Sequence, residues 1–586
     1  MIARPPDRRL RAVVVVPARD EQERIGPCLR ALAQQRGVQP EAFEVVLVLD
    51  QCRDATRDRA LRVAAASPQL TLIVLQSQTP GAGHARRVGM DFACRRLLDA
   101  GRPLGLVAST DADSRVAPDW LAIQLALAGD GARAIGGHIE LDPQEAAQLP
   151  HAVLRARAVQ AEARLASLRE WDARGSASGG AGDDARATGG PASPGHHQFS
   201  GASLAVTAQT YRDIGGLPAV EALEDEALQR ALEDRGIPIV RSDDVQVTTS
   251  ARTNGRAPRG LAHDLALADW RARRSFQADE FDAQELVDHK TGAISVILPA
   301  REVADTIAPI IDAIDGLREL GLVDEILVVD SASRDGTAAI AAAHGASVLQ
   351  ENDVLGEHGP ARGKGDAMWR ALSVARGEIV VFLDTDTRDF TPGFVVGLLG
   401  PLMYHREIRF VKGAFLRPLD LGGCVIPGEG GRVTELVARP LLNLYAPHLA
   451  CFDQPLAGEV ATYADVLRGL WFPAGYGVEI ANLIDVANEA GLDALAQVDL
   501  GERQNRHQPL RDLTAMSYAI IVAAATRLYE SGLTPPAAPG PLALPPESRG
   551  AMVETRQVIV FERPPLTSLA TSRDHQAAVN RPSASV

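Results

Sequence analysis

Two pairs of aspartates, each separated by one residue, are the features of this sequence with the clearest chemistry. Asp384 and Asp386 follow the apolar run 379–383, and Asp111 and Asp113 follow a similar run. A short apolar run that ends at polar residues predicts a strand buried in a parallel sheet. Open α/β sheets bind ligands beyond the carboxyl ends of such strands, where paired carboxylates could hold Mg²⁺ or Mn²⁺ with a diphosphate. The alternative for either pair alone is a helix N-cap with an acidic first turn.

The elements that must position these pairs occur twice, in the same order. Upstream of each pair lies an apolar run that leads into Pro-Ala-Arg, starting at Pro17 in one half and at Pro299 in the other. A second run ends at Asp50 in the first half and at Asp330 in the second. Three matched strand ends in one order indicate two copies of one α/β domain, built on a largely parallel sheet.

The repeat and the composition of the segments predict the domain organisation. We expect two tandem Rossmann-like α/β domains, at residues 1–280 and 293–528. A segment rich in Gly, Ala and Ser at 172–195 is expected to interrupt the first domain as a mobile linker or lid. The Pro- and Ala-rich residues 529–586 are expected to form a partly disordered tail.

Composition excludes several classes of function. The net charge of the 586 residues is −15, which argues against a nucleic-acid partner, because affinity for a polyanion needs many Lys and Arg contacts. Five cysteines without metal-type spacing favour a reduced, cytoplasmic protein. No apolar stretch approaches the roughly 20 residues of a membrane helix.

The motifs of the first copy resemble the family 2 glycosyltransferases. A glycine-rich turn at 81–86 opens a helix, and its amides could face a diphosphate with Arg86 or Arg87. The Pro-Ala-Arg-Asp-Glu turn, the strand end at Asp50 and the Asp-Ala-Asp motif match that family in order. The resemblance implies a GT-A fold, donor binding by Pro17, Asp50 and Asp111, and a metal at Asp113.

The later part of the first copy also fits that resemblance. Glu224 and Asp225 look like the acidic motif that supplies the catalytic base of inverting enzymes, in which an acceptor hydroxyl loses its proton during attack. Their alternative is an acidic helix start. Arg252, Arg256 and Arg259 could clamp an anionic donor or acceptor, or could form a solvated basic loop.

The second copy carries more distinctive motifs. Lys364 stands between two glycines at a predicted helix start, where it is placed to meet a phosphate, although a surface lysine in a turn is the alternative. The segments GGRVTEL from Gly430, GYGVEI from Gly475 and RQNRHQ from Arg503 resemble the glucosyl-3-phosphoglycerate synthase family of retaining GT-A enzymes. The resemblance covers about residues 293–528.

This second resemblance implies a set of site residues. Glu479 lies under the sugar and is a candidate catalytic residue, and Asp386 coordinates the metal with Asp384 beside it. The remaining implied residues are Pro299, Ala300, Glu302, Ser331, Lys364, Asp384 and Arg503 for the donor, Gly431, Arg432 and Thr434 for the acceptor phosphate, and His507 for the metal. An arginine with a threonine hydroxyl and turn amides is sound chemistry for a phosphomonoester.

Two departures from the family pattern affect these assignments. The acid expected in the first turn is replaced by Val303, and Glu302 directly before it is a candidate substitute. The histidine usually found two residues after the arginine is replaced by Asn505, with His507 two residues further on. The alternative for His507 is a surface histidine in a polar loop.

We therefore expect a bifunctional glycosyltransferase. The second half would transfer glucose from UDP-glucose to 3-phosphoglycerate with retention, and the first half would be an inverting transferase with an unassigned acceptor. One alternative is that a single half is catalytic and the other is a degenerate binding or scaffolding module. Another is mannosyl-3-phosphoglycerate synthase activity. A nucleotidylyltransferase is disfavoured, because those enzymes need a Gly- and Arg-rich loop directly after the first strand. The sequence leaves the oligomeric state open, a homo-oligomer included.

Overall fold

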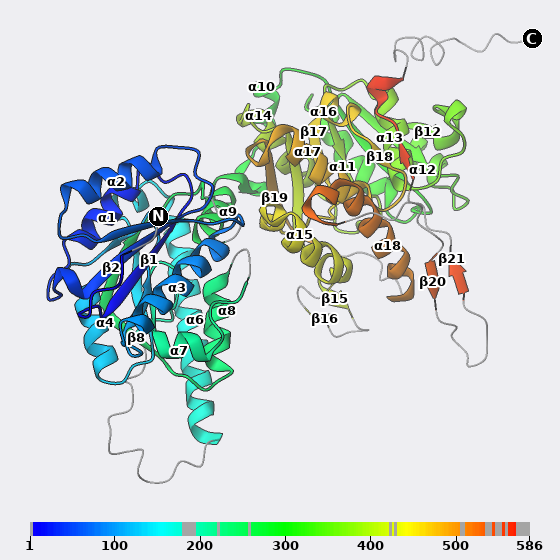
Figure 1. Ribbon diagram of the computed structural model, residues 1–586. Helices are drawn as coiled ribbons and strands as arrows, with labels where there is room; N and C mark the ends of the chain where they lie inside the picture. The colour runs from blue at the N-terminus through cyan, green and yellow to red at the C-terminus, as the bar shows by residue number, and fades with distance from the viewer. Residues whose placement is uncertain are drawn as a thin grey trace, which may run out of the picture. The chain divides into compact units, whose positions relative to one another are not determined.

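The computed structural model divides the chain into two units, at residues 1–272 and 273–586, and each unit is built on one eight-stranded sheet (Figure 1). The boundary falls inside helix α9 (Leu261–Arg274), a few residues before the end of the predicted first domain at 280. The structure describes residues 4–178, 195–219, 223–255, 260–420, 425–426, 430–503, 510–533, 542–544, 554–556 and 561–569.

The two sheets share one topology, which confirms the predicted α/β class in two copies. The strand order is β3-β2-β1-β4-β7-β6-β8-β5 in the first unit and β12-β11-β10-β13-β17-β14-β19-β9 in the second. In both, the first strand lies between two parallel neighbours, and a later strand then pairs antiparallel with the strand that ends at the aspartate pair. Only the last edge strand differs, because β5 is antiparallel to β8 whereas β9 is parallel to β19.

The first unit contains the following strands and helices. The strands are β1 (Ala12–Ala18), β2 (Phe43–Leu49), β3 (Leu72–Gln76), β4 (Leu106–Ser109), β5 (Arg115–Val116), β6 (Ala134–Leu141), β7 (Leu204–Thr207) and β8 (Ile239–Thr249). The helices are α1 (Ile25–Ala33), α2 (Thr56–Ala66), α3 (Ala82–Asp99), α4 (Trp120–Gly129), α5 (Pro143–Ala146), α6 (His151–Ser178), α7 (Ala208–Asp213), α8 (Glu224–Glu233) and α9.

The second unit contains the following elements. The sheet strands are β9 (Ser275–Gln277), β10 (Ile294–Ala300), β11 (Glu325–Asp330), β12 (Ser347–Gln350), β13 (Ile379–Phe382), β14 (Phe410–Leu416), β17 (Val460–Tyr463) and β19 (Leu495–Glu502). Three further strand pairs join β15 (Leu419–Asp420) to β16 (Val425–Ile426), β18 (Phe472–Pro473) to β22 (Glu562–Arg563), and β20 (Leu542–Leu544) to β21 (Glu554–Arg556). The helices are α10 (Ala283–His289), α11 (Ile307–Glu319), α12 (Thr337–Ala343), α13 (Lys364–Val374), α14 (Gly393–Tyr404), α15 (Arg439–Tyr445), α16 (Ala464–Arg468), α17 (Val478–Ala490) and α18 (Leu510–Arg527).

The central strands are apolar on both sides because both faces of each sheet are covered. In β1, Val14 and Val16 belong to one hydrophobic core, and Val13 and Val15 belong to a second core on the opposite face. All four side chains are fully buried. This alternation is what a parallel sheet between two helical layers requires, and it explains why the sequence shows a continuous apolar run there.

Strand register corrects one part of the predicted repeat. Ala18 of β1 pairs with Leu49, and the equivalent Ala300 of β10 pairs with Asp330. Asp330 therefore corresponds to Leu49, and Asp50 corresponds to Ser331, one residue beyond the strand. The two aspartates matched in the sequence are offset by one position, because an apolar run shows that a strand exists but not where its ladder ends.

Two predicted segments are partly described. Helix α6 extends to Ser178, so the first residues of the expected 172–195 linker are helical, and residues 179–194 lie outside the described part of the chain. In the expected tail, the short segment 561–569 contains β22, which pairs with β18 of the second unit. Among the described residues, no helix has the length and apolar character needed to cross a membrane.

Candidate active site

The second unit places Lys364 between two acids at the carboxyl edge of its sheet. Lys364 is the first residue of α13, and its Nζ forms ion pairs with Asp384, just after β13, and with Glu479 on α17 at 2.8 Å. Glu479 is buried, and the Lys364 side chain is 23% exposed. Lys364 therefore lies at the centre of a charge cluster and is not a surface lysine in a turn.

A buried arginine joins the two aspartates of the pair. Arg503 follows β19, and its Nη2 lies 3.1 Å from Asp384 and 3.1 Å from Asp386, while its Nη1 donates to Glu459. The predicted residues Lys364, Asp384, Asp386, Glu479 and Arg503 are thus in one continuous network, which we call the donor cluster. Glu459 was missed, and its only signal was a lone acid directly before an apolar strand.

Charge inside the donor cluster is fixed by these contacts. Burial alone would lower the pKa of Lys364, but the negative charges of Asp384 and Glu479 outweigh it and raise that pKa. Burial would likewise raise the pKa of Asp384, but the positive charges of Lys364 and Arg503 outweigh it and lower that pKa. Lys364 therefore stays cationic, and Asp384 stays ionised, at neutral pH. Burial raises the pKa of Glu459 even though Arg503 opposes this effect.

A glycine makes room for the cluster. A Cβ built on Gly458 would lie 2.3 Å from the Asp384 carboxylate and 2.5 Å from Lys364 Nζ. Both distances are shorter than van der Waals contact, so a side chain at position 458 would displace the Asp384 carboxylate and the Lys364 ammonium from their present positions. The neighbouring Ala457 carbonyl accepts a hydrogen bond of 2.8 Å from the buried Lys412 on β14.

A second group of predicted donor residues lies at the ends of β10 and β11. Ser331 donates from its backbone to Ala300 and from its hydroxyl to Glu351 at 2.6 Å. The Pro299 carbonyl accepts from Thr385, the residue between the two aspartates, at 2.8 Å. The structure thus connects Pro299 to the aspartate pair, and connects Ser331 to the loop that leads to Lys364.

The Glu302 side chain accepts a hydrogen bond from the backbone of a neighbouring loop. Glu302 has a left-handed backbone conformation with φ 53°, it is exposed, and its carboxylate accepts from the Arg334 amide at 2.9 Å. The amide of Val303 instead donates to Thr337, as the amide of Glu21 donates to Thr56 in the first unit. Val303 therefore occupies the position of Glu21, and Glu302 remains only a predicted donor residue.

The donor cluster has the chemistry of a site for a hard divalent cation. The Asp386 side chain is 44% exposed, and carboxylate oxygen is the donor type that Mg²⁺ and Mn²⁺ prefer. Glu459 Oε2 is buried and has no hydrogen-bond partner among the described residues, so the region can accept one more positive group. His507, the predicted histidine ligand, lies outside the described residues.

The predicted acceptor residues begin a separate helical element. Thr434 is the first residue of a π-helical turn, Thr434–Ala438, and it is buried together with Gly431, while Arg432 is half-buried. The described contacts of Gly431 are local, since its carbonyl accepts from the Glu435 amide at 3.0 Å. The phosphate site formed by these three residues stays a prediction.

In the first unit, an arginine forms ion pairs with two of the predicted acidic residues. Arg86 on α3 forms ion pairs with Asp111 at 2.6 Å and with Glu224 at 2.8 Å, and it also donates to Ser109 and to the Gly201 carbonyl. A Cβ on Gly201 would lie 2.4 Å from the guanidinium. Arg86 is thus enclosed by protein groups, and its contact with a diphosphate stays a prediction.

A second arginine binds the other acid of the first pair. Arg252 lies 2.5 Å from Glu21 and 2.9 Å from Asp113. Burial, reinforced by the nearby Asp111, raises the pKa of Asp113 to about 7, although Arg252 opposes this. Arg256 and Arg259 lie outside the described residues.

The remaining predicted residues of the first unit lie near this centre. Asp225 is the second residue of α8, accepts from the Gly201 amide at 3.1 Å, and has its pKa raised by burial and by Glu224. Asp50 accepts from the Gly81 amide at 3.0 Å, and its Oδ1 has no partner among the described residues.

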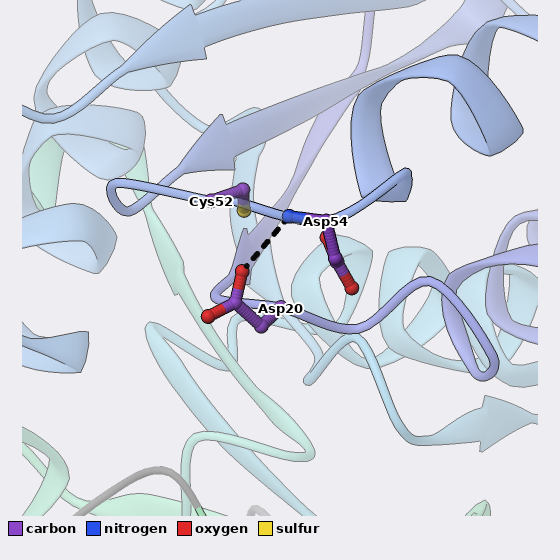
Figure 2. A group of neighbouring side chains, drawn as sticks. All are labelled: Asp20, Cys52 and Asp54. Carbon is purple, nitrogen blue, oxygen red and sulfur yellow. Dashed lines mark hydrogen bonds between the residues drawn. The ribbon is translucent and has the colours of Figure 1, made fainter.

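A further polar group of the first unit lies in the loops after β1 and β2. Asp20, Cys52 and Asp54 each have a side-chain atom within 4.8 Å of those of the other two, and Figure 2 shows the Asp20 carboxylate directed at the Asp54 amide. Asp20 also accepts from the Arg53 amide at 2.7 Å. Glu302 makes the same contact with the Arg334 amide in the second unit, so this carboxylate-to-amide hydrogen bond joins the two equivalent loops in both units.

Comparison with known proteins places the chain among glycosyltransferases. The model of glycosyl transferase family 2 matches residues 13–178 and 295–402, so it finds both halves. Glucosyl-3-phosphoglycerate synthase of Mycolicibacterium paratuberculosis is 43% identical over 332 residues, which cover 55% of this chain and 99% of that protein. The enzyme of the same name from Petrotoga mobilis is 37% identical over 306 residues, covering 51% of this chain and 94% of its own length.

Solved structures with similarity to the chain bear related names. Mannosyl-3-phosphoglycerate synthase from Rubrobacter xylanophilus has a TM-score of 0.47 and 45% identity, over 52% of this chain and 100% of that chain. Glucosyl-3-phosphoglycerate synthase from Mycobacterium tuberculosis, in complex with Mn²⁺, UDP and phosphoglyceric acid, has a TM-score of 0.45 and 41% identity, over 50% of this chain and 96% of that chain.

Proposed function

The chain belongs to the glucosyl-3-phosphoglycerate synthase family of hexosyltransferases, and from this premise we propose that its second unit transfers glucose from UDP-glucose to 3-phosphoglycerate with retention. The observation that carries the proposal is the donor cluster, in which Lys364 and Arg503 hold Asp384, Asp386 and Glu479 at the carboxyl edge of the sheet. Two fixed cations beside an aspartate pair suit a diphosphate and a divalent metal.

Length supports the assignment to the second unit. The match to the Mycolicibacterium protein extends over 332 residues, and the first unit has only 272. The second unit, from 273 to 586, has 314 residues, close to the length of the match. The motifs that resemble the family in the sequence all lie in this unit as well.

The residues of the donor cluster suggest how the reaction proceeds. The hydroxyl of 3-phosphoglycerate attacks the anomeric carbon, the bond from that carbon to the β-phosphate oxygen breaks, and the departing phosphate accepts the hydroxyl proton on the same face. Lys364 and Arg503 would hold the diphosphate, and Glu479 would shape the sugar pocket. A bound Mg²⁺ or Mn²⁺, held by Asp386, would neutralise charge on the leaving diphosphate.

Product analysis tests this proposal. The purified chain is incubated with UDP-glucose or GDP-mannose, with 3-phosphoglycerate and Mn²⁺, and the products are identified by mass spectrometry and by the NMR coupling of the anomeric proton. We expect an α-linked glucosyl product that needs both substrates and is lost in Lys364→Met. Lys290→Met, which alters a lysine paired with Asp324 elsewhere in the unit, is the matched control. If only the mannosyl product formed, the transferred sugar would be mannose and not glucose. If neither donor gave a product, the proposal would be refuted.

The predicted acceptor site is tested separately. Arg432→Ala should raise the KM for 3-phosphoglycerate about ten- to a hundred-fold, since a charge-assisted phosphate contact contributes roughly 1.5–3 kcal/mol. The KM for UDP-glucose should change little. If the donor KM rose instead, Arg432 would belong to the donor site.

For the first unit we propose an inverting transferase whose base is Asp225, with an unassigned acceptor. The observation that favours Asp225 over Glu224 is that Arg86 already holds the Glu224 carboxylate, whereas burial raises the pKa of Asp225 toward that of a useful base. The test uses a chain whose second unit is inactivated by Lys364→Met, and measures release of the nucleoside diphosphate from each member of a panel of nucleotide sugars. Release that is lost on adding Asp225→Asn supports the proposal. No release from any donor would favour a binding or scaffolding module.

A further inference from the structure

A buried aspartate in the second unit holds two arginines, one of them from the far end of the chain. Asp366 is the third residue of α13 and is fully buried. Its carboxylate accepts from Arg370 Nε at 3.2 Å, and from Arg563 Nε and Nη2 at 3.1 and 2.8 Å. Arg563 is separated from Asp366 by 197 residues and belongs to β22. An isolated carboxylate could not be buried there without such partners.

The two arginines use their remaining N–H groups on one loop. Arg370 donates to the carbonyls of Glu351, Val354 and Gly359. Arg563 donates to the carbonyls of His358 and Pro360, and the Asp366 carboxylate also accepts from the Arg362 amide at 3.0 Å. The loop 351–363 contains two 3₁₀ turns, Glu351–Asp353 and Gly356–His358, and it is held by one aspartate and two arginines.

Both ends of this loop adjoin predicted residues of the donor site. At its start, the Glu351 carboxylate accepts the Ser331 hydroxyl at 2.6 Å. At its end, Lys364 begins α13 and forms ion pairs with Asp384 and Glu479. A displacement of either end of the loop can therefore be passed to Ser331 or to Lys364.

The segment that brings Arg563 to this place is itself anchored. Its strand pairs with β18, and the Pro564 carbonyl accepts from Trp369 Nε1 at 3.0 Å. Glu562 forms an ion pair with Arg527 of α18 at 2.6 Å. Strand β18 leads within a few residues into α17, the helix that carries Glu479. The C-terminal segment 561–564 thus touches the elements on both sides of Lys364.

We propose that Arg563 is a positioning residue of the donor site, which acts through Asp366 and the loop 351–363 to hold Lys364 and Ser331 for the nucleotide diphosphate. The proposal rests on the proposed function of the second unit. Arg563 itself contacts protein groups and not the reacting atoms. Through Arg563, the C-terminal segment 561–564 would contribute to the geometry of the donor site.

Two variants test the proposal in the full-length chain. Arg563→Met removes every hydrogen bond of the guanidinium, and Arg563→Lys keeps a charge near Asp366 but cannot reach the two carbonyls at once. Arg409→Met is the matched control, because Arg409 also binds one aspartate, Asp465, through two hydrogen bonds of 2.9 and 3.0 Å. Amide hydrogen exchange of the peptide 351–363 and calorimetric binding of UDP with Mn²⁺ are measured together with transfer.

We expect Arg563→Met to raise exchange in 351–363 selectively and to raise the Kd for UDP about tenfold, with a smaller change in kcat. Arg563→Lys should be intermediate, and Arg409→Met should resemble the wild type. Unchanged exchange or unchanged UDP affinity in Arg563→Met would overturn the proposal. If Arg563→Met raised exchange throughout the second unit, Arg563→Lys would decide the proposal. Exchange raised only in 351–363 of Arg563→Lys would support it, and unchanged exchange in that loop would refute it. A wild type that does not bind UDP would overturn the proposed function and this role together, whereas a wild type that binds UDP as tightly as Arg563→Met does would overturn the positioning role alone.

Discussion

The two units have the same sheet but hold their acids with different cations. In the second unit, Lys364 from the first residue of α13 lies between Asp384 and Glu479. In the first unit, α3 begins with Ala82, and Arg86 from the next turn lies between Asp111 and Glu224. The Lys364 side chain is 23% exposed and that of Arg86 is 4% exposed. The lysine can therefore meet a ligand directly, whereas the arginine is largely used by the protein itself.

A second arginine follows the equivalent strand in each unit but pairs with a different acid. Arg252 follows β8 and binds Glu21, and Arg503 follows β19 and binds Glu459. The register of β7 against β4, and of β17 against β13, places Ser203 of the first unit at the position of Glu459. Val303 occupies the position of Glu21. The acid missing from the first turn of the second unit is thus supplied by Glu459, directly before β17, and not by Glu302.

The difference in burial predicts a difference in stability. Arg86→Met should lower the free energy of unfolding by about 3–5 kcal/mol, because it leaves Asp111 and Glu224 without their buried partner. Lys364→Met should cost less, because Asp384 keeps Arg503. Urea unfolding measures both, and Arg115→Met, which breaks an exposed ion pair with Asp142, should cost only about 0–1 kcal/mol. Equal losses for Arg86 and Lys364 would remove the distinction drawn between the two cations.

The difference in ligand access predicts which aspartate pair supports transfer to 3-phosphoglycerate. Asp386→Ala should lower kcat by about 10²–10³-fold, the usual cost of losing one stabiliser of transition-state charge. Asp113→Ala should leave this reaction unchanged, because Arg252 already binds Asp113 in the other unit. Steady-state assays with Mn²⁺, repeated in EDTA, check both. Transfer that survives EDTA, or an unchanged kcat in Asp386→Ala, would contradict the assigned metal role.

The sequence predicted some residues of these two charge clusters and missed others. The apolar runs and the acids after them predicted both sheets and the positions of Asp111 and Asp384, because strand ends are local features. The matching of Asp50 with Asp330 was wrong by one residue, because register depends on the neighbouring strand. Glu459 and Arg563 could not be found at all, because each acts through a partner distant in the sequence and neither lies in a recognisable motif.

A buried lysine distinguishes the units in their response to pH. Lys412 on β14 corresponds by register to Gly136 on β6, and burial lowers the pKa of Lys412 to about 8 although Glu479 and Glu459 oppose this. The unfolded chain binds this proton more tightly, so the contribution of Lys412 to stability rises as the pH increases from about 8 to about 10.5. Below this window the buried charge costs about 3 kcal/mol, since one pKa unit corresponds to roughly 1.4 kcal/mol.

Lys412→Met should remove this dependence. The stability of the variant minus that of the wild type should fall by up to about 3 kcal/mol between pH 8 and 10.5, and the subtraction cancels groups common to both chains. Urea unfolding at several pH values measures the difference. A difference that is constant across this window would show that Lys412 keeps an ordinary pKa.

The smallest expected effect tests whether Glu459 in the second unit replaces the acid that Glu21 provides in the first unit. Glu459→Gln leaves Arg503 with one charged partner fewer, and Val303→Glu restores an acid at the position of Glu21, which binds Arg252 at 2.5 Å in the first unit. Each single change should destabilise the second unit, the first by weakening a buried ion pair and the second by adding a carboxylate beside an arginine that is already neutralised. In the double variant the new acid can pair with Arg503, so the combined loss should be smaller than the sum by about 1 kcal/mol, a coupling typical of residues that share a partner. Urea unfolding of the four chains gives this coupling directly, with Val303→Gln in place of Val303→Glu as the control that lacks the charge. Strict additivity would mean that the first turn of the second unit no longer faces Arg503, and that the two arginines are equivalent only in their place along the chain.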